Sequence, residues 1–268
     1  MTTGDVPFVS FDRVSLSFDD VVVLNELSFT LHTGHMMVLL GASGAGKSVM
    51  LKLVLGLLKP DSGEIRINGE RSDTMTEPQL MKVRGDIGML FQEGALFDSL
   101  TVADNVGYRL YEELDMPADD VRRRVEEVLG FVGLGDYTGR MPTELSGGQR
   151  RRVAIARAIA SKPRLVLFDS PTSGLDPITS KTVDNEVIKL RDLEHVTSIL
   201  VTHQLDDAFY VATHEAVIED GRTVIRQAER AEMQDTEFLV LKDGRVYFEG
   251  NTADLHASAD AYLRRYLS

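Results

Sequence analysis

The chain has 268 residues, enough for one large domain or two small lobes, and its 43% hydrophobic content is ordinary for a protein with a buried core. Its 42 acidic residues against 29 basic ones give a net charge of -13, which disfavours a nucleic-acid partner because phosphate backbones are repelled. The absence of cysteine excludes disulfides and thiolate metal sites.

The N-terminal part of the chain indicates short strands, then a strand, a loop and a helix. The start MTTGDVPFVS lacks the basic residues and apolar core of a secretory signal. Residues 7–31 alternate and cluster apolar residues as short strands do. HMMVLLG (35–41) is typical of a buried strand, SVMLKLVLGLL (48–58) has helical spacing, and DSGEIRING (61–69) indicates a turn and a strand. These apolar stretches are too short to span a bilayer, so we expect any membrane role to come through a partner.

The middle of the chain changes to helical patterns. The segment 117–134 is expected to be a helix with one apolar face, formed by Val121, Val125, Val128, Leu129 and Val132. A second helix is predicted from Ser146 to Ala160, ending before Pro163.

The C-terminal part returns to strands. RLVLFD (164–169) and TSILVTH (197–203) indicate buried strands. Two hairpins are predicted at 215–226 and 237–250, each with an Asp-Gly turn, and 259–267 is predicted to be a final helix. Strands and helices that alternate around a helical middle favour an α/β core with an inserted helical lobe.

A glycine-rich loop carries the strongest chemical signal. GASGAGKS, from Gly41 to Ser48, fits G-x-x-x-x-G-K-[ST] at every position, and it stands between a strand and a helix. Backbone N–H groups and the helix N-terminus favour a phosphate, Lys47 can reach the β- and γ-phosphates, and the Ser48 hydroxyl can bind Mg²⁺. An incidental lysine in a glycine-rich turn is the weaker alternative. The expected phosphate-binding residues are Gly41, Ser43, Gly44, Ala45, Gly46, Lys47, Ser48 and Val49.

An acid closes the strand LVLFD. By itself, Asp169 would be an ordinary strand terminator. Because a phosphate loop is present, we expect its carboxylate to serve the Mg²⁺ ion of the bound nucleotide. The predicted metal-binding residues therefore include Ser48 and Asp169.

The stretch ELSGGQRRRVAIARAIASKPRLVLFDSPTSGLD (144–176) resembles the ABC-transporter ATPases, and the resemblance covers nearly the whole chain. It implies an α/β fold with a RecA-like P-loop core, an N-terminal antiparallel β portion, an inserted α-helical subdomain and a short C-terminal extension. The implied division of the single domain 1–268 places the core with its β portion at 1–88 and 162–220, the Q-loop and helical subdomain at 89–161, and the extension at 221–268.

Several single residues match the family's motifs. The resemblance implies that Phe18 stacks on adenine, that Gln92 of the Q-loop contacts Mg²⁺ and water, and that His203 is the switch histidine at the γ-phosphate. Each has an ordinary alternative: a core aromatic, a loop residue and a strand-end histidine. Their order along the chain favours the functional interpretation. SGLD, ending at Asp176, matches the D-loop.

The signature LSGGQ has a physical logic of its own. Ser146 is expected to cap a helix, and Gly147 and Gly148 expose backbone donors there, which makes a second anion site with Gln149. The resemblance implies that this site closes on the γ-phosphate held by a second protomer, so that a homodimer sandwiches two ATP. We expect the arginines at 150–152 to be partly at the surface and partly in electrostatic support of phosphate, or simply a solvated face.

A narrower likeness lies after the Q-loop. FQEGALFDSLTVADNV (91–106) looks like the ATPases of Mla-type, MCE-linked lipid transport systems, in which this segment lines the groove for the permease's coupling helix. The likeness implies an integral-membrane permease and an MCE-type lipid-binding protein as partners. It also implies a phospholipid or other hydrophobic substrate, and a peripheral position on the cytoplasmic face of the inner cell membrane.

One position departs from the family. Most members have a glutamate after the strand-end aspartate, where it activates water, and this chain has Ser170. Loss of a positioned base typically costs about 10²–10⁴-fold in rate. Three interpretations of Ser170 are open. In the first, the serine is natural, and water is oriented by its own hydroxyl, by His203 or by a neighbouring residue. In the second, it is natural in a slow ATPase that works as an ATP-gated clamp, and in the third it is an engineered substitution. We favour a natural, slow ATPase, with Ser170, His203 and Gln92 as the catalytic candidates.

Three other functions stay open. A soluble ABC ATPase that acts on DNA or ribosomes usually has two ATPase halves, a coiled-coil insertion or basic arms, and this acidic chain has none of these. A regulatory ATP-binding module with little hydrolysis is compatible with Ser170. An importer ATPase for another substrate is the third.

Overall fold

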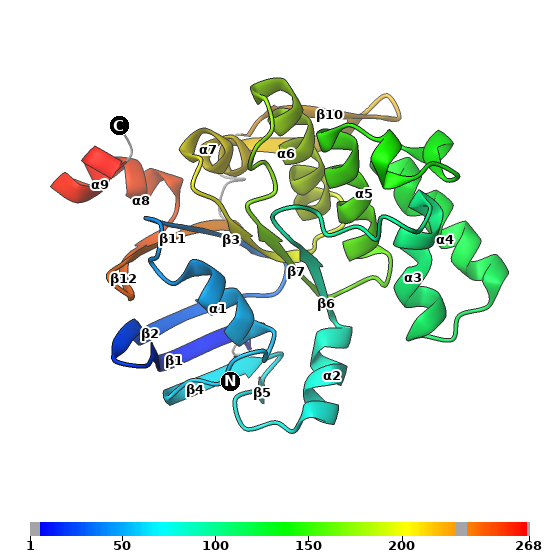
Figure 1. Cartoon of the computed structure of the whole chain (residues 1–268). Coiled ribbons are helices and arrows are strands. Elements are labelled where there is room, and N and C mark those ends of the chain that lie inside the picture. The colour runs from blue at the N-terminus through cyan, green and yellow to red at the C-terminus, as the bar shows by residue number, and fades with distance from the viewer. Residues whose placement is uncertain (1–5, 229–234, 267–268) are drawn as a thin grey trace, which may run out of the picture.

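The computed structural model describes residues 6–228 and 235–266. Within them, a six-stranded sheet with the strand order β12-β11-β3-β8-β7-β6 forms the centre of the molecule (Figure 1). Its strands are β3 (Met36–Gly41), β6 (Ile87–Leu90), β7 (Leu165–Asp169), β8 (Thr197–Val201), β11 (Thr236–Lys242) and β12 (Arg245–Gly250). All neighbours pair in parallel except β11 and β12. The strands predicted at 35–41, 164–169 and 197–203 are confirmed.

The central sheet separates two hydrophobic cores. Successive residues of β3 alternate between them: Val38 and Leu40 belong to one core, Met37 and Leu39 to the other. All six residues of β3 are buried, as expected for a parallel strand that is covered on both faces. The alternation of a strand therefore explains why one short apolar run supports both cores.

A four-stranded sheet, β2-β1-β4-β5, covers one face together with the first helix. It consists of β1 (Val9–Phe18), β2 (Val21–Leu31), β4 (Ser62–Ile67) and β5 (Glu70–Arg71), and α1 (Lys47–Val54) lies between it and the central sheet (Figure 1). The pairs β1–β2 and β1–β4 are antiparallel. This sheet is the N-terminal antiparallel β portion that the family resemblance implied.

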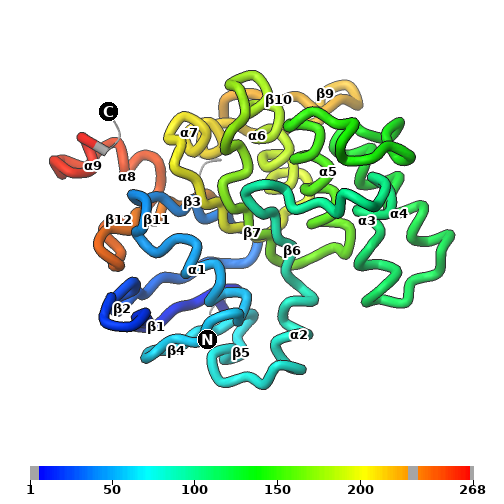
Figure 2. Tube along the Cα trace, viewed as in Figure 1, coloured from blue at the N-terminus to red at the C-terminus, as the bar shows by residue number. Residues whose placement is uncertain are grey.

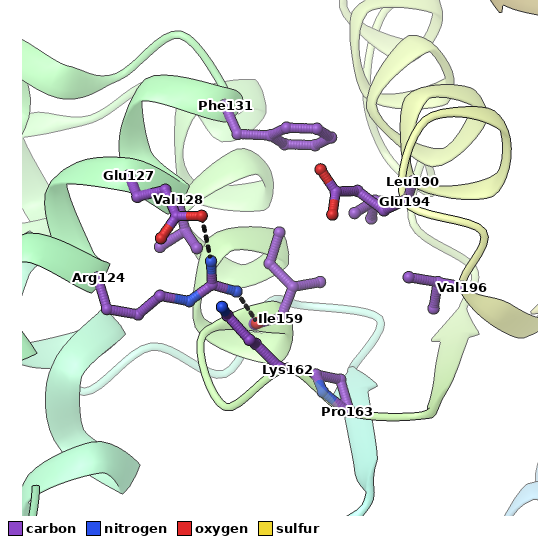
Figure 3. Close-up of a pocket in the computed structure, with 10 residues that line it drawn as sticks. All are labelled: Arg124, Glu127, Val128, Phe131, Ile159, Lys162, Pro163, Leu190, Glu194 and Val196. Atoms are coloured by element: carbon purple, nitrogen blue, oxygen red, sulfur yellow. Dashed lines mark hydrogen bonds and ion pairs between the residues drawn. The ribbon is translucent and has the colours of Figure 1, made fainter.

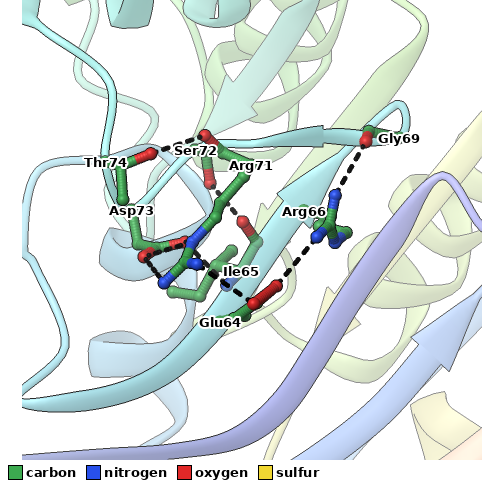
Figure 4. Close-up of polar contacts among 8 residues, drawn as sticks. All are labelled: Glu64, Ile65, Arg66, Gly69, Arg71, Ser72, Asp73 and Thr74. Carbon is green, nitrogen blue, oxygen red and sulfur yellow. Dashed lines mark hydrogen bonds and ion pairs between the residues drawn. The ribbon is translucent and has the colours of Figure 1, made fainter.

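A polar cluster stabilises the edge of this sheet that β4 and β5 form (Figure 4). Arg71 forms ion pairs with Glu64 and Asp73, each at 3.0 Å. Asp73 also accepts the backbone N–H of Ile65 at 3.0 Å. Partial burial opposes ionisation of Asp73, but the bonds from Arg71 and Ile65 lower its pKa below the ordinary value. The cluster thus holds the loop after β5 on the edge of β4.

Helices cover the other face of the central sheet (Figure 2). A helical group extends to one side, with α3 (Val102–Glu112), α4 (Ala118–Phe131) and α5 (Gly147–Ile159) in mutual contact. The predicted apolar face at 117–134 is confirmed, because all five of its residues are 4% exposed or less. The predicted helix from Ser146 is also confirmed, with Ser146 as its N-cap. Other helical elements before β9 are α2 (Glu77–Gly85), α6 (Pro177–Asp192), α7 (Leu205–Thr213) and two 3-10 turns (Gly135–Tyr137, Pro142–Glu144).

Both C-terminal hairpins form as predicted. β9 (His214–Glu219) and β10 (Arg222–Gln227) make a separate two-stranded sheet, and β11 and β12 make the second hairpin. Both residues of each Asp-Gly turn have positive φ, 49° and 74° in the first and 51° and 72° in the second, as type I′ turns require. Along the chain, the hairpin of β9 and β10 therefore stands between α7 and β11.

The end of the chain departs from a simple extension. β11 pairs in parallel with β3, so this part of 221–268 belongs to the central sheet. The predicted final helix is confirmed as α9 (Ala261–Tyr266), and α8 (Thr252–Ala257) precedes it; Leu267 lies outside the described residues. In the ranges described, no helix is long and apolar enough to cross a membrane.

Candidate active site

The carboxyl ends of four parallel strands bring the site together. β3 leads into the phosphate loop, β7 ends at Asp169, β8 is followed by His203, and β6 by Gln92. Because these strands run in the same direction, their ends meet at one edge of the sheet, where ligands of open α/β sheets bind. In the sheet register, Asp169 is paired with Val201, and Val201 with Leu39 of β3.

The phosphate loop has the geometry that its sequence indicates. α1 begins at Lys47, and its N-cap Gly46 has a φ of 97°. A Cβ atom at Gly46 would lie 2.6 Å from Leu24 Cδ2, so the position requires glycine. The Lys47 Nζ donates to the carbonyls of Gly41 at 2.7 Å and Ala42 at 2.9 Å. The lysine therefore lies across the loop, and the free N–H groups of the first helical turn remain available for a phosphate.

Lys47 and Asp169 carry opposite charges at this edge. Burial lowers the pKa of Lys47, and the negative charge of Asp169 partly opposes that change. Burial raises the pKa of Asp169, and the Ser170 hydroxyl and the charges of Lys47 and Lys52 oppose the rise. The two charges stabilise each other in a half-buried place, where Coulomb interactions are stronger than in water.

The donor set fits a magnesium nucleotide. Ser48 provides a hydroxyl at the start of α1, Asp169 a carboxylate at the end of β7, and Gln92 an amide after β6. Magnesium prefers hard oxygen ligands and is usually held by one or two protein groups together with substrate phosphates. In the part of the chain that is described, no three His, Asp or Glu side chains gather to hold a metal by themselves.

Ser170 is tightly held and turned towards Asp169. It is 8% exposed, has a φ of 49°, and donates its backbone N–H to Val201 O at 2.8 Å. Its Oγ donates to Asp169 Oδ1 at 3.4 Å. The hydroxyl proton is therefore directed at a carboxylate, and the residue has no group that could accept a proton from water.

The Q-loop and the D-loop are joined by an arginine that the sequence analysis placed elsewhere. Arg151 is 7% exposed and donates to Phe91 O at 3.2 Å and to Ser173 O at 3.1 Å. Gln92 Nε2 adds a bond to Ser173 Oγ at 3.3 Å. The expectation of a position at the surface is therefore wrong for Arg151, and electrostatic support of phosphate stays a prediction. The sequence signal for burial of Arg151 was its helical spacing: it lies three residues after Gly148 and four before Ile155, which are both buried on the same face of α5.

The neighbouring arginines also serve the backbone. Arg150 donates to Leu145 O at 2.7 Å, and Arg152 donates to Val132 O at 2.9 Å. Further along α5, Arg157 donates to the Q-loop carbonyls of Gly94 at 2.8 Å and Ala95 at 2.7 Å. Arg151 and Arg157 together thus bind the backbone of the Q-loop to the signature helix α5.

The signature residues contact the D-loop segment of their own chain. Ser146 Oγ accepts the N–H of Gln149 at 3.3 Å, which confirms the predicted cap. A Cβ at Gly148 would lie 2.2 Å from Thr179 Cγ2, so α5 can approach α6 only with glycine there. Gly147 lies against Leu175. The structure thus forms two groups, the phosphate loop with Asp169 and Ser170, and the Q-loop with the signature and the D-loop.

Three further predicted residues lie around these groups. Phe18 ends β1 and is 45% exposed, so the alternative that it is a core aromatic is wrong. His203 is exposed and lines a pocket of about 930 Å³ together with residues of α6 and α7. Asp176 caps α6, accepting the N–H groups of Ile178 and Thr179 at 3.1 Å each. Its predicted contact with nucleotide stays a prediction.

Another cavity, of about 450 Å³, lies away from these residues (Figure 3). It opens between α4, the end of α5 and the end of α6, and Pro163, just before β7, lines it. Arg124 donates to Ile159 O at 2.8 Å there and pairs with Glu127. The cavity is at the amino end of β7, whereas the phosphate loop follows the carboxyl end of β3, so it is not part of the nucleotide site.

Comparison with known proteins identifies the class that this site defines. A family model described as ABC transporter matches residues 24–173, more than half of the chain. The chain therefore belongs to the ABC transporter family, as the ATPase subunit that binds and hydrolyses ATP with Mg²⁺.

Individual relatives agree with the family. The chain is 37% identical to the sulfate/thiosulfate import ATP-binding protein CysA of Gloeobacter violaceus, over 97% of this chain and 74% of CysA. It is 36% identical to the intermembrane phospholipid transport system ATP-binding protein MlaF of Escherichia coli, over 93% of this chain and 95% of MlaF.

Solved structures show the same fold. The dimeric ATP-binding cassette MJ0796, bound to ADP and Pi in a post-hydrolysis state, is 29% identical with a TM-score of 0.73, over 91% of this chain and 98% of that one. CbiO1 of Clostridium perfringens, part of the ABC transporter complex cbiONQ, is 25% identical with a TM-score of 0.80, over 94% of this chain and 91% of that one. The RecA-like core with an inserted helical region is thus confirmed.

Proposed function

We propose that the chain drives a membrane permease that moves phospholipid or a related hydrophobic substrate. One observation carries this proposal: the chain matches MlaF over 93% of its own length and 95% of that protein's, whereas it spans 74% of the sulfate importer CysA. The CysA match keeps an importer of another substrate as the alternative.

An exposed aromatic surface beside the Q-loop supports a permease as the partner. Phe91 is 46% exposed and Phe97 44%, and on α3 Tyr108 is 41% and Tyr111 43% exposed. The rings of Phe97 and Tyr108 lie 4.8 Å apart, with the guanidinium of Arg157 above Phe97 at 5.9 Å. Exposed apolar clusters of this kind commonly mark interaction sites, and a helix from a partner is a common occupant.

The proposed working unit is a homodimer with two composite sites. In each, the phosphate loop and Phe18 hold ATP, and Ser48, Gln92 and Asp169 hold Mg²⁺. The signature of the second chain, Ser146–Gln149, closes on the γ-phosphate, with Asp176 beside it. The dimer reported for MJ0796 supports this arrangement.

Transmission to the permease is proposed to use the helical region from Met89 to Ser161, rotating against the rest of the domain. Arg151 and Arg157 support this, since they bind α5 to the Q-loop backbone. When α5 moves, the Q-loop with Gln92 and the aromatic surface next to it move as well.

Hydrolysis is proposed to be slow. Ser170 supplies no base, and its hydroxyl is directed to Asp169. His203 and Gln92 are then the groups that position the attacking water, and the rate depends mainly on orientation of ATP. A regulatory module with little turnover is the second candidate, and Ser170 is the observation that favours it.

The partners and place in the cell follow from the proposal. We assign the chain to the cytoplasmic face of the membrane, held there by the permease, with an MCE-type lipid-binding protein as the further partner. The test is co-expression of the chain with candidate permeases of both the lipid and the importer types. Co-purification in detergent and ATP-dependent movement of a fluorescent phospholipid are expected with the first type only, and activity with the importer type alone would contradict the proposal.

A further inference from the structure

The pocket lined by His203 contains an acidic cluster that the ATPase site does not explain. It lies between α6 and α7, which run next to each other (Figure 1), and has a volume of about 930 Å³. Asp184 of α6 and Asp206 and Asp207 of α7 line it. Two of these acids differ in their contacts. Asp184 is buried and has no hydrogen-bond partner among the described residues, whereas Asp207 accepts a hydrogen bond from Thr172, next to the D-loop.

Asp184 is 1% exposed, and within 6–228 and 235–266 neither of its carboxylate oxygens has a hydrogen-bond partner. Burial, and next the negative charge of Asp207, raises the pKa of Asp184 to about 8, although Lys181 opposes the rise. An ionised carboxylate is very costly where burial removes it from bulk water and no donor binds it, whereas the uncharged acid is tolerated. Both the burial and the missing partners therefore favour the protonated form of Asp184.

Asp207 holds the loop that carries Ser170. Its Oδ2 accepts a hydrogen bond from the hydroxyl of Thr172, a side chain that is 1% exposed. Thr172 O in turn accepts the N–H of Leu175 at 3.1 Å, and Ser170 O accepts the N–H of Ser173 at 3.1 Å. The bond from Thr172 to Asp207 therefore connects the turn between β7 and α6 to α7, the helix that follows His203. Such a bond is stronger when the carboxylate is ionised.

The charged and titratable groups around Asp184 come from every neighbouring element. Lys181 of its own helix lies 5.3 Å from the centre of the Tyr210 ring. The Tyr210 hydroxyl donates to Asn185 at 2.9 Å, so it is engaged beside Asp184. The remaining groups are Asp206 and Asp207 of α7, His203 before α7 and His214 of β9.

We propose that Asp184 is a positioning residue for ATP hydrolysis: it remains protonated, so that Asp207 alone carries the negative charge that anchors Thr172 and the turn from Ser170 to Asp176. When Asp184 releases its proton to solvent under alkaline conditions, two carboxylates repel each other and the turn loses its anchor. The phosphate loop is untouched by this change. The kcat for ATP then falls while KM stays the same.

This inference depends on the ATPase activity of the family and not on the transported substrate. The test is therefore the pH profile of kcat and KM for ATP with the full chain, from about pH 6 to about pH 9.5, where a single ionisation costs up to about tenfold per pH unit. Asp184→Asn keeps the shape of the neutral acid and cannot ionise. Asp206→Asn is the matched control, because Asp206 lines the same pocket and is exposed.

Asp184→Asn is expected to keep kcat within about twofold of the parent at pH 7 and to lose the alkaline fall, while Asp206→Asn follows the parent. A loss of about tenfold or more at pH 7 in soluble, folded Asp184→Asn, or an alkaline fall that persists in it, would overturn the proposal. A requirement of the parent for a monovalent cation that Asp184→Asn abolishes would also overturn it, because a bound cation would then replace the proton.

A spectroscopic measurement keeps the proposal testable if Asp184→Asn does not fold. In the parent at pH 7, infrared spectra are expected to show the carbonyl band of a protonated carboxylic acid, which disappears as the pH rises through about 8. Asp206→Asn retains this band. If the parent lacks this carbonyl band at pH 7, the proposal is contradicted whatever the ATPase activity. A failure of lipid transport changes neither the infrared band nor the pH profile of ATP hydrolysis.

Discussion

Replacement of Arg151 by alanine tests the proposed link between the Q-loop and the D-loop. The buried guanidinium donates to Phe91 O at 3.2 Å and to Ser173 O at 3.1 Å. Hydrogen bonds from charged groups contribute about 1.5–3 kcal/mol each, so the gross loss is about 3–6 kcal/mol. Phe91 is 46% exposed, which lets water replace part of this loss. We therefore expect Arg151→Ala to lower the free energy of unfolding by about 2–3 kcal/mol.

The assay is urea unfolding of the full chain, with Arg122→Ala as the control. Arg122 is an arginine of α4 whose side chain is 68% exposed and pairs with Asp119 three residues away, so its loss should change stability by less than about 0.5 kcal/mol. Binding of ATP should persist in both variants, because neither touches the phosphate loop. A stability of Arg151→Ala within about 0.5 kcal/mol of the parent would refute the reasoning.

Three further predictions concern single residues. Gly46→Ala is expected to weaken ATP binding at least about tenfold by calorimetry, because its Cβ would lie 2.6 Å from Leu24 Cδ2 at a positive φ; unchanged affinity contradicts this. Asp73→Ala should remove stability that the parent has above about pH 4 and loses on acidification, because Arg71 helps to lower the Asp73 pKa; equal acid unfolding of both chains would speak against it. The parent should lose about 1.4 kcal/mol of unfolding free energy per pH unit as pH rises from about 4 to 8, because folded Asp184 holds a proton that the unfolded chain releases. Asp184→Asn should abolish this loss, and the same pH dependence of stability in both chains would exclude the explanation.

Local signals predicted much of the fold and the nucleotide site. The Asp-Gly turns of both hairpins, the cap at Ser146 and the phosphate loop are set by a few adjacent residues, and the structure has each of them. The short helix α8, which was not predicted, also has a local signal in the sequence. Asn251 and Asp254 form its capping box, a recognisable start.

Non-local pairings could not be predicted in the same way. The position of β11 next to β3 joins segments about 200 residues apart, and an apolar run by itself does not identify its partner strand. Arg151 and Asp184 belong to polar residue types that are usually exposed, and only tertiary packing buries them. Such violations of the usual pattern often occur at functional sites.

The central claim is that this chain is an ABC ATPase whose turnover Ser170 keeps slow. The most direct test is steady-state ATP turnover of the chain with its membrane partner, measured beside Ser170→Glu, with Lys47→Ala as the control that shows the activity comes from this site. The account predicts a slow parent and a gain of at least about tenfold with the glutamate. A parent that already turns over rapidly, with no gain from glutamate, would contradict it.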